Sequence, residues 1–335
     1  MHSLSRDDGE DRCEGRQIVA PARHCPVCDT SSTEARLFAE ENIDRDKLSS
    51  FSFASRKEPE FMCHRLVQCP TCDLVYVDRP PSVDELARAY HVAEFDSSDE
   101  ANDAALAYVR ALQPTLQKLA RREQALEIGT GTGIFLEHLA RAGFSELTGV
   151  EPSAAAIAAA PPHRRGWIRE AIFDERDFAP ASFDLICCFM TLEHVRDPNA
   201  LAQAALRLLR PGGAFVTVTH DYRSLVNRLL GRRSPIIDIE HMQLFSARSM
   251  QYLFAESGYA DVAVRPFVNT YALRYWLRLT PLPQGLKRGL LALMAPLHAD
   301  RIRIGVNVGN LVTSGFKDAP TTSSAHSALA TDRTR

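Results

Sequence analysis

The feature that most constrains the fold is a regular alternation of short apolar segments and helical segments that begins at Gln124. The predicted strands are 124–129, 146–152, 166–172, 183–189, 214–220, 261–267 and 304–315. The predicted helices among them are 132–143, 153–160, 199–213 and 246–259. Strands that alternate with helices form a mostly parallel sheet with helices on both faces. The sequence therefore predicts an α/β fold for this part of the chain.

A glycine-rich turn follows the first predicted strand, in "LEIGTGTGIF". Its glycines, Gly129, Gly131 and Gly133, allow a tight turn and let backbone N–H groups approach a ligand closely. Glu151 ends the second predicted strand, eighteen residues after Gly133. A carboxylate at that place can accept both hydroxyls of a ribose. This combination predicts a nucleotide-type ligand, and the glycine spacing favours S-adenosylmethionine (SAM) over a nicotinamide dinucleotide, which prefers G-x-G-x-x-G.

Five segments, in this order, resemble the motifs of class I SAM-dependent methyltransferases. They are "ALEIGTGTGIF" (125–135), "GVEPS" (149–153), "SFDLICCFMTLEHVRDP" (182–198), "LLRPGGAFVTVT" (208–219) and "HMQLFSARSMQYLFAESGY" (241–259). The resemblance covers roughly residues 85–315. It implies a Rossmann-like sheet of seven strands in which the last strand is antiparallel, and it implies methyl transfer from SAM.

The resemblance also implies which residues hold SAM. They are Glu127, Gly129, Thr130, Gly131, Gly133, Glu151, Pro152, Ser153, Ile172 and Phe173. Glu127 and the loop glycines would line the methionine end, Glu151 would bind the ribose hydroxyls, and Pro152 would border the adenine. This chain departs from the family in one place. Many relatives have an Asp there to hold the adenine amine, but this chain has Ile172, so Ile172 or Phe173 would pack on the ring.

Four polar residues are candidates for the chemistry, because bases in this fold lie at the carboxyl ends of strands or on the following segment. His194 follows the fourth predicted strand, His220 and Asp221 end the fifth, and His241 precedes a helix. Histidine suits a general base because its ordinary pKa lies near neutrality. His241 is the preferred base. Shaping the pocket, packing and helix capping are the alternative roles.

The sequence in and after the fourth predicted strand excludes some classes of methyl acceptor. No N-P-P-Y or D-P-P-Y follows it, which argues against methylation of an exocyclic base amine or a Gln side chain. Cys187 and Cys188 lie inside this apolar strand, so we expect core residues and not the nucleophile of a cytosine-carbon methyltransferase.

A cluster of arginines follows the fifth strand, at positions 223, 228, 232 and 233. It either holds an anionic group of the acceptor or forms a solvated helix face.

Two C-x-x-C pairs precede the α/β part, Cys25 with Cys28 and Cys69 with Cys72. This pattern predicts a zinc ribbon, in which two turns supply four thiolates in a tetrahedron. A complete set of thiolates leaves no open coordination position, so the predicted zinc is structural. In such a small module, metal binding supplies much of the folding free energy. The module resembles caps found in front of bacterial methyltransferases that act on sugars and other secondary metabolites.

The charge distribution distinguishes between RNA and a small molecule as the methyl acceptor. Residues 1–90 hold 12 Lys or Arg and 17 Asp or Glu, a net charge of −5, whereas residues 222–317 hold 13 and 5, a net charge of +8. Because a module that binds nucleic acid normally carries a basic surface, the acidic N-terminal part favours a small-molecule acceptor over RNA.

The polar N-terminus, the lack of a spanning apolar run and the paired cysteines predict a cytoplasmic protein.

The predicted organisation is a tail (1–20), a zinc-ribbon module (21–82), a methyltransferase domain (83–317) and a second tail (318–335). Segment 271–297 can wall the acceptor pocket, cover a homodimer partner or contact a membrane surface. The predicted function is methyl transfer from SAM to a small or carrier-linked, potentially anionic acceptor, with O-methylation ahead of sugar C-methylation. A ribosomal RNA methyltransferase that uses its zinc module to bind RNA, and an inactive binding subunit, are the alternatives.

Overall fold

The computed structural model describes residues 22–49, 52–54, 60–94, 99–280 and 282–319. The predicted N-terminal tail and nearly all of the predicted C-terminal tail lie outside these residues.

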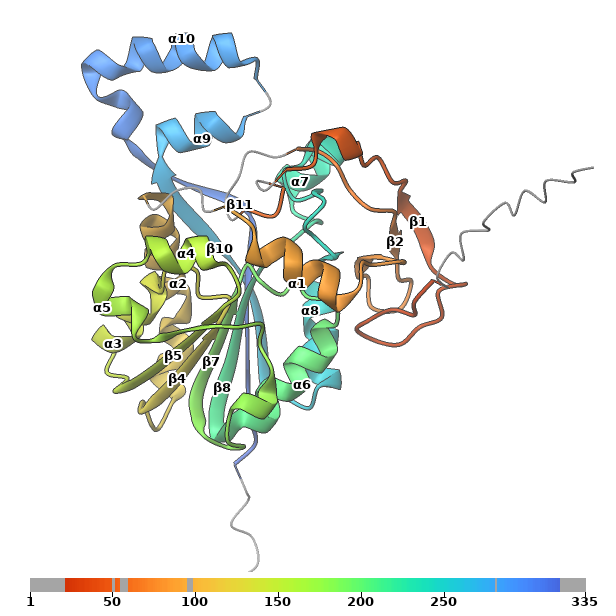
Figure 1. Cartoon of the computed structure of the whole chain (residues 1–335), viewed down its shortest axis with the longest axis vertical. Helices are drawn as coiled ribbons and strands as arrows, with labels where there is room; N and C mark the ends of the chain where they lie inside the picture. The colour runs from red at the N-terminus through yellow and green to blue at the C-terminus, as the bar shows by residue number, and fades with distance from the viewer. Residues whose placement is uncertain (1–21, 50–51, 55–59, 95–98, 281, 320–335) are drawn as a thin grey trace, which may run out of the picture.

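The larger sheet has seven strands in the order β10-β11-β8-β7-β4-β5-β6 (Figure 1). They are β4 (Gln124–Ile128), β5 (Glu146–Glu151), β6 (Ile168–Glu170), β7 (Phe183–Phe189), β8 (Leu209–His220), β10 (Ala260–Ala272) and β11 (Arg303–Phe316). Strands β4 to β8 pair in parallel, and β11 runs antiparallel between β8 and β10. The predicted α/β sheet with an antiparallel last strand is confirmed.

Helices cover both faces of this sheet. They are α2 (Asp99–Lys118), α3 (Ile134–Arg141), α4 (Ala154–Ala159), α5 (Pro162–Arg165), α6 (Pro198–Leu208) and α8 (Ala247–Glu256), with a 3-10 turn η2 (Glu175–Asp177). Neighbouring strand residues face opposite cores: Leu185 packs with α2 and α3, whereas Ile186 packs with α6 and α8. Both side chains are fully buried, as the continuous apolar sequence of a central parallel strand requires.

One strand begins earlier than the sequence predicts. The helix expected over 199–213 ends at Leu208, and β8 starts at Leu209 instead of Ala214. Gly213 makes this possible, because a Cβ there would lie 2.9 Å from the carbonyl oxygen of Arg210 and 3.1 Å from that of Asp184. The chain therefore runs close to the neighbouring backbone where a helix exit was expected.

The N-terminal module is a smaller antiparallel sheet whose last strand comes from the larger domain. It consists of β1 (Arg36–Ala39), β2 (Leu66–Gln68), β3 (Val75–Val77) and β9 (Gln243–Leu244), with a 3-10 turn η1 (Arg45–Lys47). Leu74 and Tyr76 also belong to the same apolar cluster as Phe215 of β8. The division of the chain at residue 82 stays a prediction, but the two parts share a sheet and a core.

The remaining elements surround the carboxyl edge of the sheet. They are α1 (Val83–His91), α7 (Leu225–Leu230), η3 (Gly231–Arg233), α9 (Leu273–Leu279), α10 (Gln284–Met294), η4 (Ala295–Leu297) and η5 (Ala299–Arg301). The hairpin of α9 and α10, inserted between β10 and β11, projects from the domain (Figure 1). Within the part of the chain that the structure describes, no helix combines the length and apolar content needed to cross a bilayer.

Candidate active site and metal centre

The glycine turn after β4 has the backbone that its sequence requires. Gly129, Gly131 and Gly133 have φ of 75°, 55° and 67°, in the left-handed region that glycine adopts at little cost. A Cβ on Gly129 would lie 2.1 Å from Oγ1 of Thr191, so the turn and the segment after β7 are in close contact. At Gly131 a Cβ would meet no atom within 4 Å. The turn thus leaves open space on one side, where a ligand fits.

Two buried carboxylates face this turn. Glu151, at the end of β5, accepts hydrogen bonds from the backbone N–H groups of Gly131 (2.8 Å) and Ser153 (2.9 Å). Glu127, in β4, accepts a hydrogen bond from the hydroxyl of Thr130. Burial raises the pKa of both carboxyls, that of Glu127 to about 8. Each oxygen of Glu151 has spare acceptor capacity, which suits a pair of ribose hydroxyls.

A cavity of about 1160 Å³ joins this turn to the carboxyl ends of β7 and β8. The predicted cofactor residues that line it are Glu127, Gly129, Thr130, Gly131, Glu151, Pro152, Ser153, Ile172 and Phe173. Gly133 has a different place, as the left-handed residue that precedes α3. The residues present therefore fit SAM: an open turn with backbone N–H groups, a carboxylate at the tip of β5, and the apolar side chains of Ile172 and Phe173.

The three predicted histidines meet at the other end of the same cavity. The rings of His194 and His241 lie 4.8 Å apart between centroids, and those of His220 and His241 lie 5.8 Å apart. Nδ1 of His241 lies 2.8 Å from the carbonyl oxygen of Ile236. Because a carbonyl oxygen can only accept, Nδ1 carries the hydrogen and Nε2 is left as the acceptor nitrogen. Burial lowers the pKa of His241, so its imidazole is neutral at pH 7.

His194 is held in a similar way. Its Nδ1 lies 3.2 Å from the carbonyl oxygen of Glu240 and 3.0 Å from the hydroxyl of Tyr90. The same carbonyl accepts a hydrogen bond from Tyr90 (3.2 Å). Burial lowers the pKa of His194 as well. Because the carbonyl oxygen of Glu240 can only accept, Nδ1 carries the hydrogen in His194 as it does in His241.

The third histidine is tied to a buried glutamate. Glu193 accepts a hydrogen bond from the backbone N–H of His220 (2.7 Å), and Nδ1 of His220 lies 3.2 Å from the same carboxylate oxygen. Burial alone would raise the pKa of Glu193. The hydrogen bond and charge of His220, with the two neighbouring imidazoles, lower this pKa by more, so that the net shift is downward. A buried anion beside three imidazoles stabilises positive charge on any of them.

Asp221 and two arginines of the predicted cluster, Arg223 and Arg232, make contacts within the protein. Asp221 accepts a hydrogen bond from the backbone N–H of Arg223 (2.8 Å), and its backbone pairs with Phe245. The guanidinium of Arg223 is bound to Asp73 in the cysteine module. Nη2 of Arg232 lies 3.5 Å from the carbonyl oxygen of Glu40. These contacts favour a structural role for Arg223 over the predicted binding of an anionic acceptor.

Several residues of the site were missed from the sequence. Tyr90 lies in α1, and Glu193 and Glu240 each precede a histidine, in "LEHV" and "IEHM"; that repeated Glu-His pair was an available signal. Asn269 and Asn310, on β10 and β11, line the cavity and are 3% and 2% exposed. Their side-chain oxygens have no hydrogen-bond partner among the described residues. Only the pairing of these two strands brings them to the cavity.

The four predicted zinc ligands come together in the smaller sheet. Sγ of Cys25 lies 3.5 Å from that of Cys72, Sγ of Cys28 lies 3.5 Å from that of Cys69, and all four lie within 4.8 Å of one another as free thiols. Sulfurs about 2.3 Å from a tetrahedral zinc lie about 3.8 Å apart. The cluster therefore fits zinc.

The two cysteine turns have the same backbone. In the first, Asp29 N–H donates to the carbonyl of Cys25 (3.0 Å), and in the second Asp73 N–H donates to that of Cys69 (3.2 Å). Asp29 and Asp73 both have positive φ, 55° and 70°. Aspartate tolerates this left-handed conformation better than most residues. Two matching turns that present their thiols to one point are what a four-thiolate metal site needs.

A second group of possible ligands lies at the histidines. His194, Glu240 and His241 each offer a ligand atom, and these atoms lie within 4.8 Å of one another. Imidazole and carboxylate ligands suit divalent transition metals.

Comparisons with known proteins agree with this geometry. A family model described as a methyltransferase domain matches residues 99–264. The chain carries a class I SAM-dependent methyltransferase domain. It is an enzyme of the methyltransferase class, and the methyltransferase domain contains both the glycine turn and the three histidines.

Two curated relatives are ubiquinone biosynthesis O-methyltransferases. The methyltransferase is 26% identical over 194 residues to that of Pectobacterium atrosepticum, covering 56% of this chain and 71% of the relative. It is 30% identical over 151 residues to that of Paracidovorax citrulli, covering 42% and 60%. Among solved structures, a SAM-dependent methyltransferase of Thermotoga maritima, described as a possible histamine N-methyltransferase, has a TM-score of 0.44 at 20% identity, covering 65% of this chain and 91% of that chain.

Proposed function

We propose that this methyltransferase transfers a methyl group to a hydroxyl of a small or carrier-linked molecule, with His241 as the general base. The observation that carries the proposal is the 2.8 Å contact between Nδ1 of His241 and the carbonyl oxygen of Ile236. It leaves Nε2 as a proton acceptor in the wall of the cavity that also contains Glu151 and the glycine turn.

Each residue has a distinct task in this proposal. SAM, when bound, supplies an electrophilic methyl group on a sulfonium. Glu151 and the N–H groups of the turn hold the adenosyl part, and Glu127 lies on the side of the methionine part. His241 removes the hydroxyl proton of the acceptor as the methyl group is transferred. The anionic Glu193 stabilises the imidazolium that forms.

The cavity also supports a hydroxylated, ring-shaped acceptor. The side-chain oxygens of Asn269 and Asn310 are buried acceptors without a protein donor among the described residues, and they suit donor groups on a ligand. The aromatic side chains of Phe189, Tyr275 and Trp276 also line the cavity. The two curated relatives carry the words O-methyltransferase in their names, which supports O-methylation ahead of C-methylation.

We further propose a structural zinc in the cysteine cluster and a cytoplasmic location, where the thiols stay reduced. The four sulfur positions and the two matching turns support zinc. A metal held by His194, Glu240 and His241 is the competing use of the histidines. It would occupy a nitrogen that the base requires, so added Zn²⁺ is expected to inhibit the reaction.

The test measures S-adenosylhomocysteine formed from SAM with a panel of phenols, nucleotide sugars and total RNA. We expect turnover with a hydroxylated small molecule, and loss of about a hundredfold or more in kcat for His241→Gln with SAM affinity unchanged. Turnover with RNA alone would instead establish the RNA alternative. A folded, zinc-loaded protein that does not bind SAM would establish the inactive binding subunit.

A further inference from the structure

The hairpin of α9 and α10 carries an apolar face that no other described residue covers. Leu286, Leu293 and Leu297 are 50%, 74% and 81% exposed. Spacings of seven and four residues place these leucines on one side of the helical segment. Gly289, also exposed, lies beside them. None of the residues of α10 is buried, and the helix packs mainly on α9, η4 and η5.

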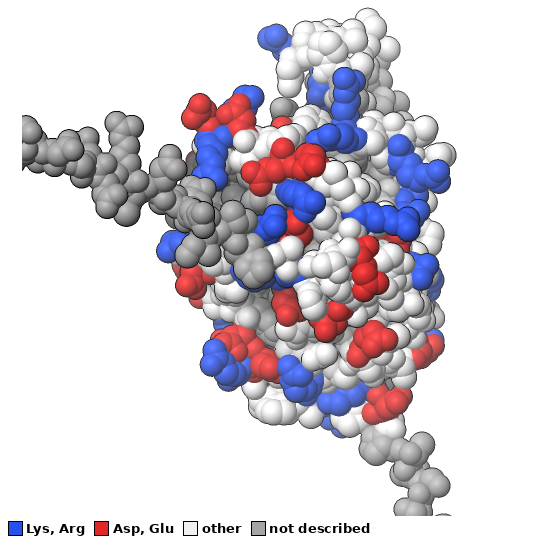
Figure 2. Space-filling model, turned by 90° about the vertical axis from the view of Figure 1, so that its right-hand side faces the viewer, with Lys and Arg blue, Asp and Glu red and all other residues white. Residues whose placement is uncertain are grey.

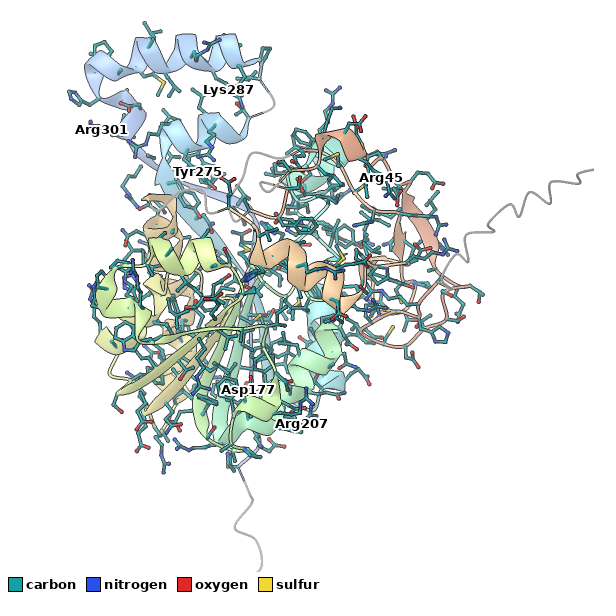
Figure 3. The ribbon with its side chains drawn as sticks, in the orientation of Figure 1. Arg45, Asp177, Arg207, Tyr275, Lys287 and Arg301 are labelled. Carbon is teal, nitrogen blue, oxygen red and sulfur yellow. The ribbon has the colours of Figure 1, made fainter. Side chains whose placement is uncertain are left out.

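The same hairpin is strongly basic. Residues 273–303 contain one acidic residue, Asp300, and six basic ones: Arg274, Arg278, Lys287, Arg288, Arg301 and Arg303. Arg288 and Arg301 are exposed. Lys287 lies between the helices and donates to the carbonyl oxygen of Arg278 (2.7 Å), and Arg301 lies near the base of the hairpin (Figure 3). In Figure 2 the upper lobe is white with blue side chains at its margins.

We propose that this hairpin docks on an anionic membrane surface, with Leu286, Leu293 and Leu297 inserted at the level of the headgroups and the exposed Arg288 and Arg301 on lipid phosphates. Helices that lie in the interface combine an apolar side with Lys and Arg outside it; here Arg288 lies outside the leucine side of α10, and Arg301 lies near the base of the hairpin. Each exposed cation near an anionic leaflet adds to the affinity, whereas Arg303 adds little because it is already paired with Asp103.

The positive charge of the hairpin also argues against a second copy of this chain as the partner that covers its leucines. In a two-fold dimer the same patch faces itself, so two hairpins that are both positively charged would be brought close together. Asp300, together with the Asp103 that pairs with Arg303, neutralises only part of this charge. An anionic surface has the complementary charge, and three leucines with one glycine offer little apolar area for a stable dimer of this kind.

Docking at this place has a consequence for the acceptor, and this one step rests on the proposed function. Tyr275 and Trp276, on α9, line the cavity, and Trp276 donates to the carbonyl oxygen of Ile304 (2.9 Å). Tyr275 lies at the foot of the hairpin (Figure 3). The element that would contact lipid therefore forms part of the cavity wall, which suits an acceptor that is dissolved in, or attached to, the membrane.

Co-sedimentation of the full chain with vesicles tests the proposal without SAM or an acceptor. We expect binding to phosphatidylcholine vesicles that contain phosphatidylglycerol, weaker binding to phosphatidylcholine alone, and release by salt. The double variant Leu293→Ser/Arg288→Ala should lower the partition coefficient about tenfold or more. The matched control, Leu37→Ser/Arg45→Ala, removes an exposed leucine and an exposed arginine from the cysteine module and should bind as the unaltered protein does.

Three results would overturn the proposal. One is no binding to the anionic vesicles, and another is an equal loss in the control variant. The third is a dimer in analytical ultracentrifugation that Leu293→Ser alone converts to a monomer, which would identify a second copy as the occupant. Because none of these measurements involves methyl transfer, failure of the proposed function leaves the result intact.

Discussion

The guanidinium of Arg223 donates two hydrogen bonds to the carboxylate of Asp73, with Nε 2.6 Å from Oδ2. Asp73 directly follows Cys72 in the second cysteine turn, and Arg223 lies three residues after His220. The neighbouring Tyr222 donates from its hydroxyl to the carbonyl oxygen of Asp73 (2.9 Å). The cysteine module is thus attached directly to the segment that follows a histidine of the site.

A second attachment reaches the proposed base. Strand β9 begins two residues after His241 and completes the module's sheet, where Tyr76 pairs with Gln243. The side chain of Gln243 donates to the carbonyl oxygens of Leu192 (2.6 Å) and Val195 (2.7 Å), on either side of His194. The module therefore braces the backbone that carries two of the histidines.

Arg223→Gln is expected to lower kcat severalfold while SAM affinity stays the same, because the glycine turn and Glu151 make no contact with this pair. The loss of stability should be only about 1 kcal/mol, since Arg223 is half-exposed and solvent screens the pair. Steady-state kinetics, SAM titration and thermal unfolding measure these quantities. The control is Arg176→Gln, whose ion pair with Asp174 is local and exposed; an equal effect there would contradict the brace.

Metal analysis of the purified protein should find about one zinc per chain, held by four thiolates. Cys72→Ser removes one ligand and is expected to lower both the zinc content and the melting temperature, because a structural metal contributes several kcal/mol to folding. Cys63→Ser is the matched control, a buried cysteine of the same module outside the cluster. Unchanged zinc content in Cys72→Ser would remove the assignment of this ligand.

Gly129→Ala should damage the cofactor turn for a steric reason that can be relieved. The added Cβ would meet Oγ1, Cγ2 and Cβ of Thr191 at 2.1, 2.7 and 2.9 Å. Removing these atoms in the double variant Gly129→Ala/Thr191→Gly should recover part of the SAM affinity and stability. Recovery stays incomplete because alanine keeps the left-handed φ of 75°, which costs about 1–2 kcal/mol. No recovery in SAM titration would place the damage elsewhere.

The predicted cofactor residues lie together along one cavity because each signal for them is local. Gly129, Gly131 and Glu151 stand at strand ends, which the strand–turn–helix pattern shows directly. Asn269 and Asn310 could not be predicted, since only the antiparallel pairing of β10 with β11 brings them to the cavity. For the same reason the short strand β9 was missed: two residues carry no periodicity, and their partner lies far away in the sequence.

Binding of SAM should release a proton from Glu127. Burial raises the pKa of this carboxyl to about 8 in the free protein, so it is mostly protonated at pH 7. A cationic ligand beside it lowers that pKa, and up to about one proton per chain leaves on binding. Calorimetry at pH 7 in two buffers of different ionisation enthalpy measures the release. Glu127→Gln should abolish it, and an equal release in this variant would exclude Glu127 as the source.

The acid limb of the pH–rate profile should lie below the ordinary histidine value of 6.5, because burial lowers the pKa of His241. His194 and His220 lower the pKa of His241 further, whereas the carboxylates of Glu240 and Glu193 raise it. Activity therefore falls as the pH decreases through this lowered pKa, because His241 takes up a proton and can no longer act as a base. Stability falls in the same direction, since the unfolded chain binds more protons between the two pKa values. His241→Gln should remove this limb from kcat/KM and leave SAM affinity unchanged; a limb that persists in the variant would assign the titration to His194 or His220.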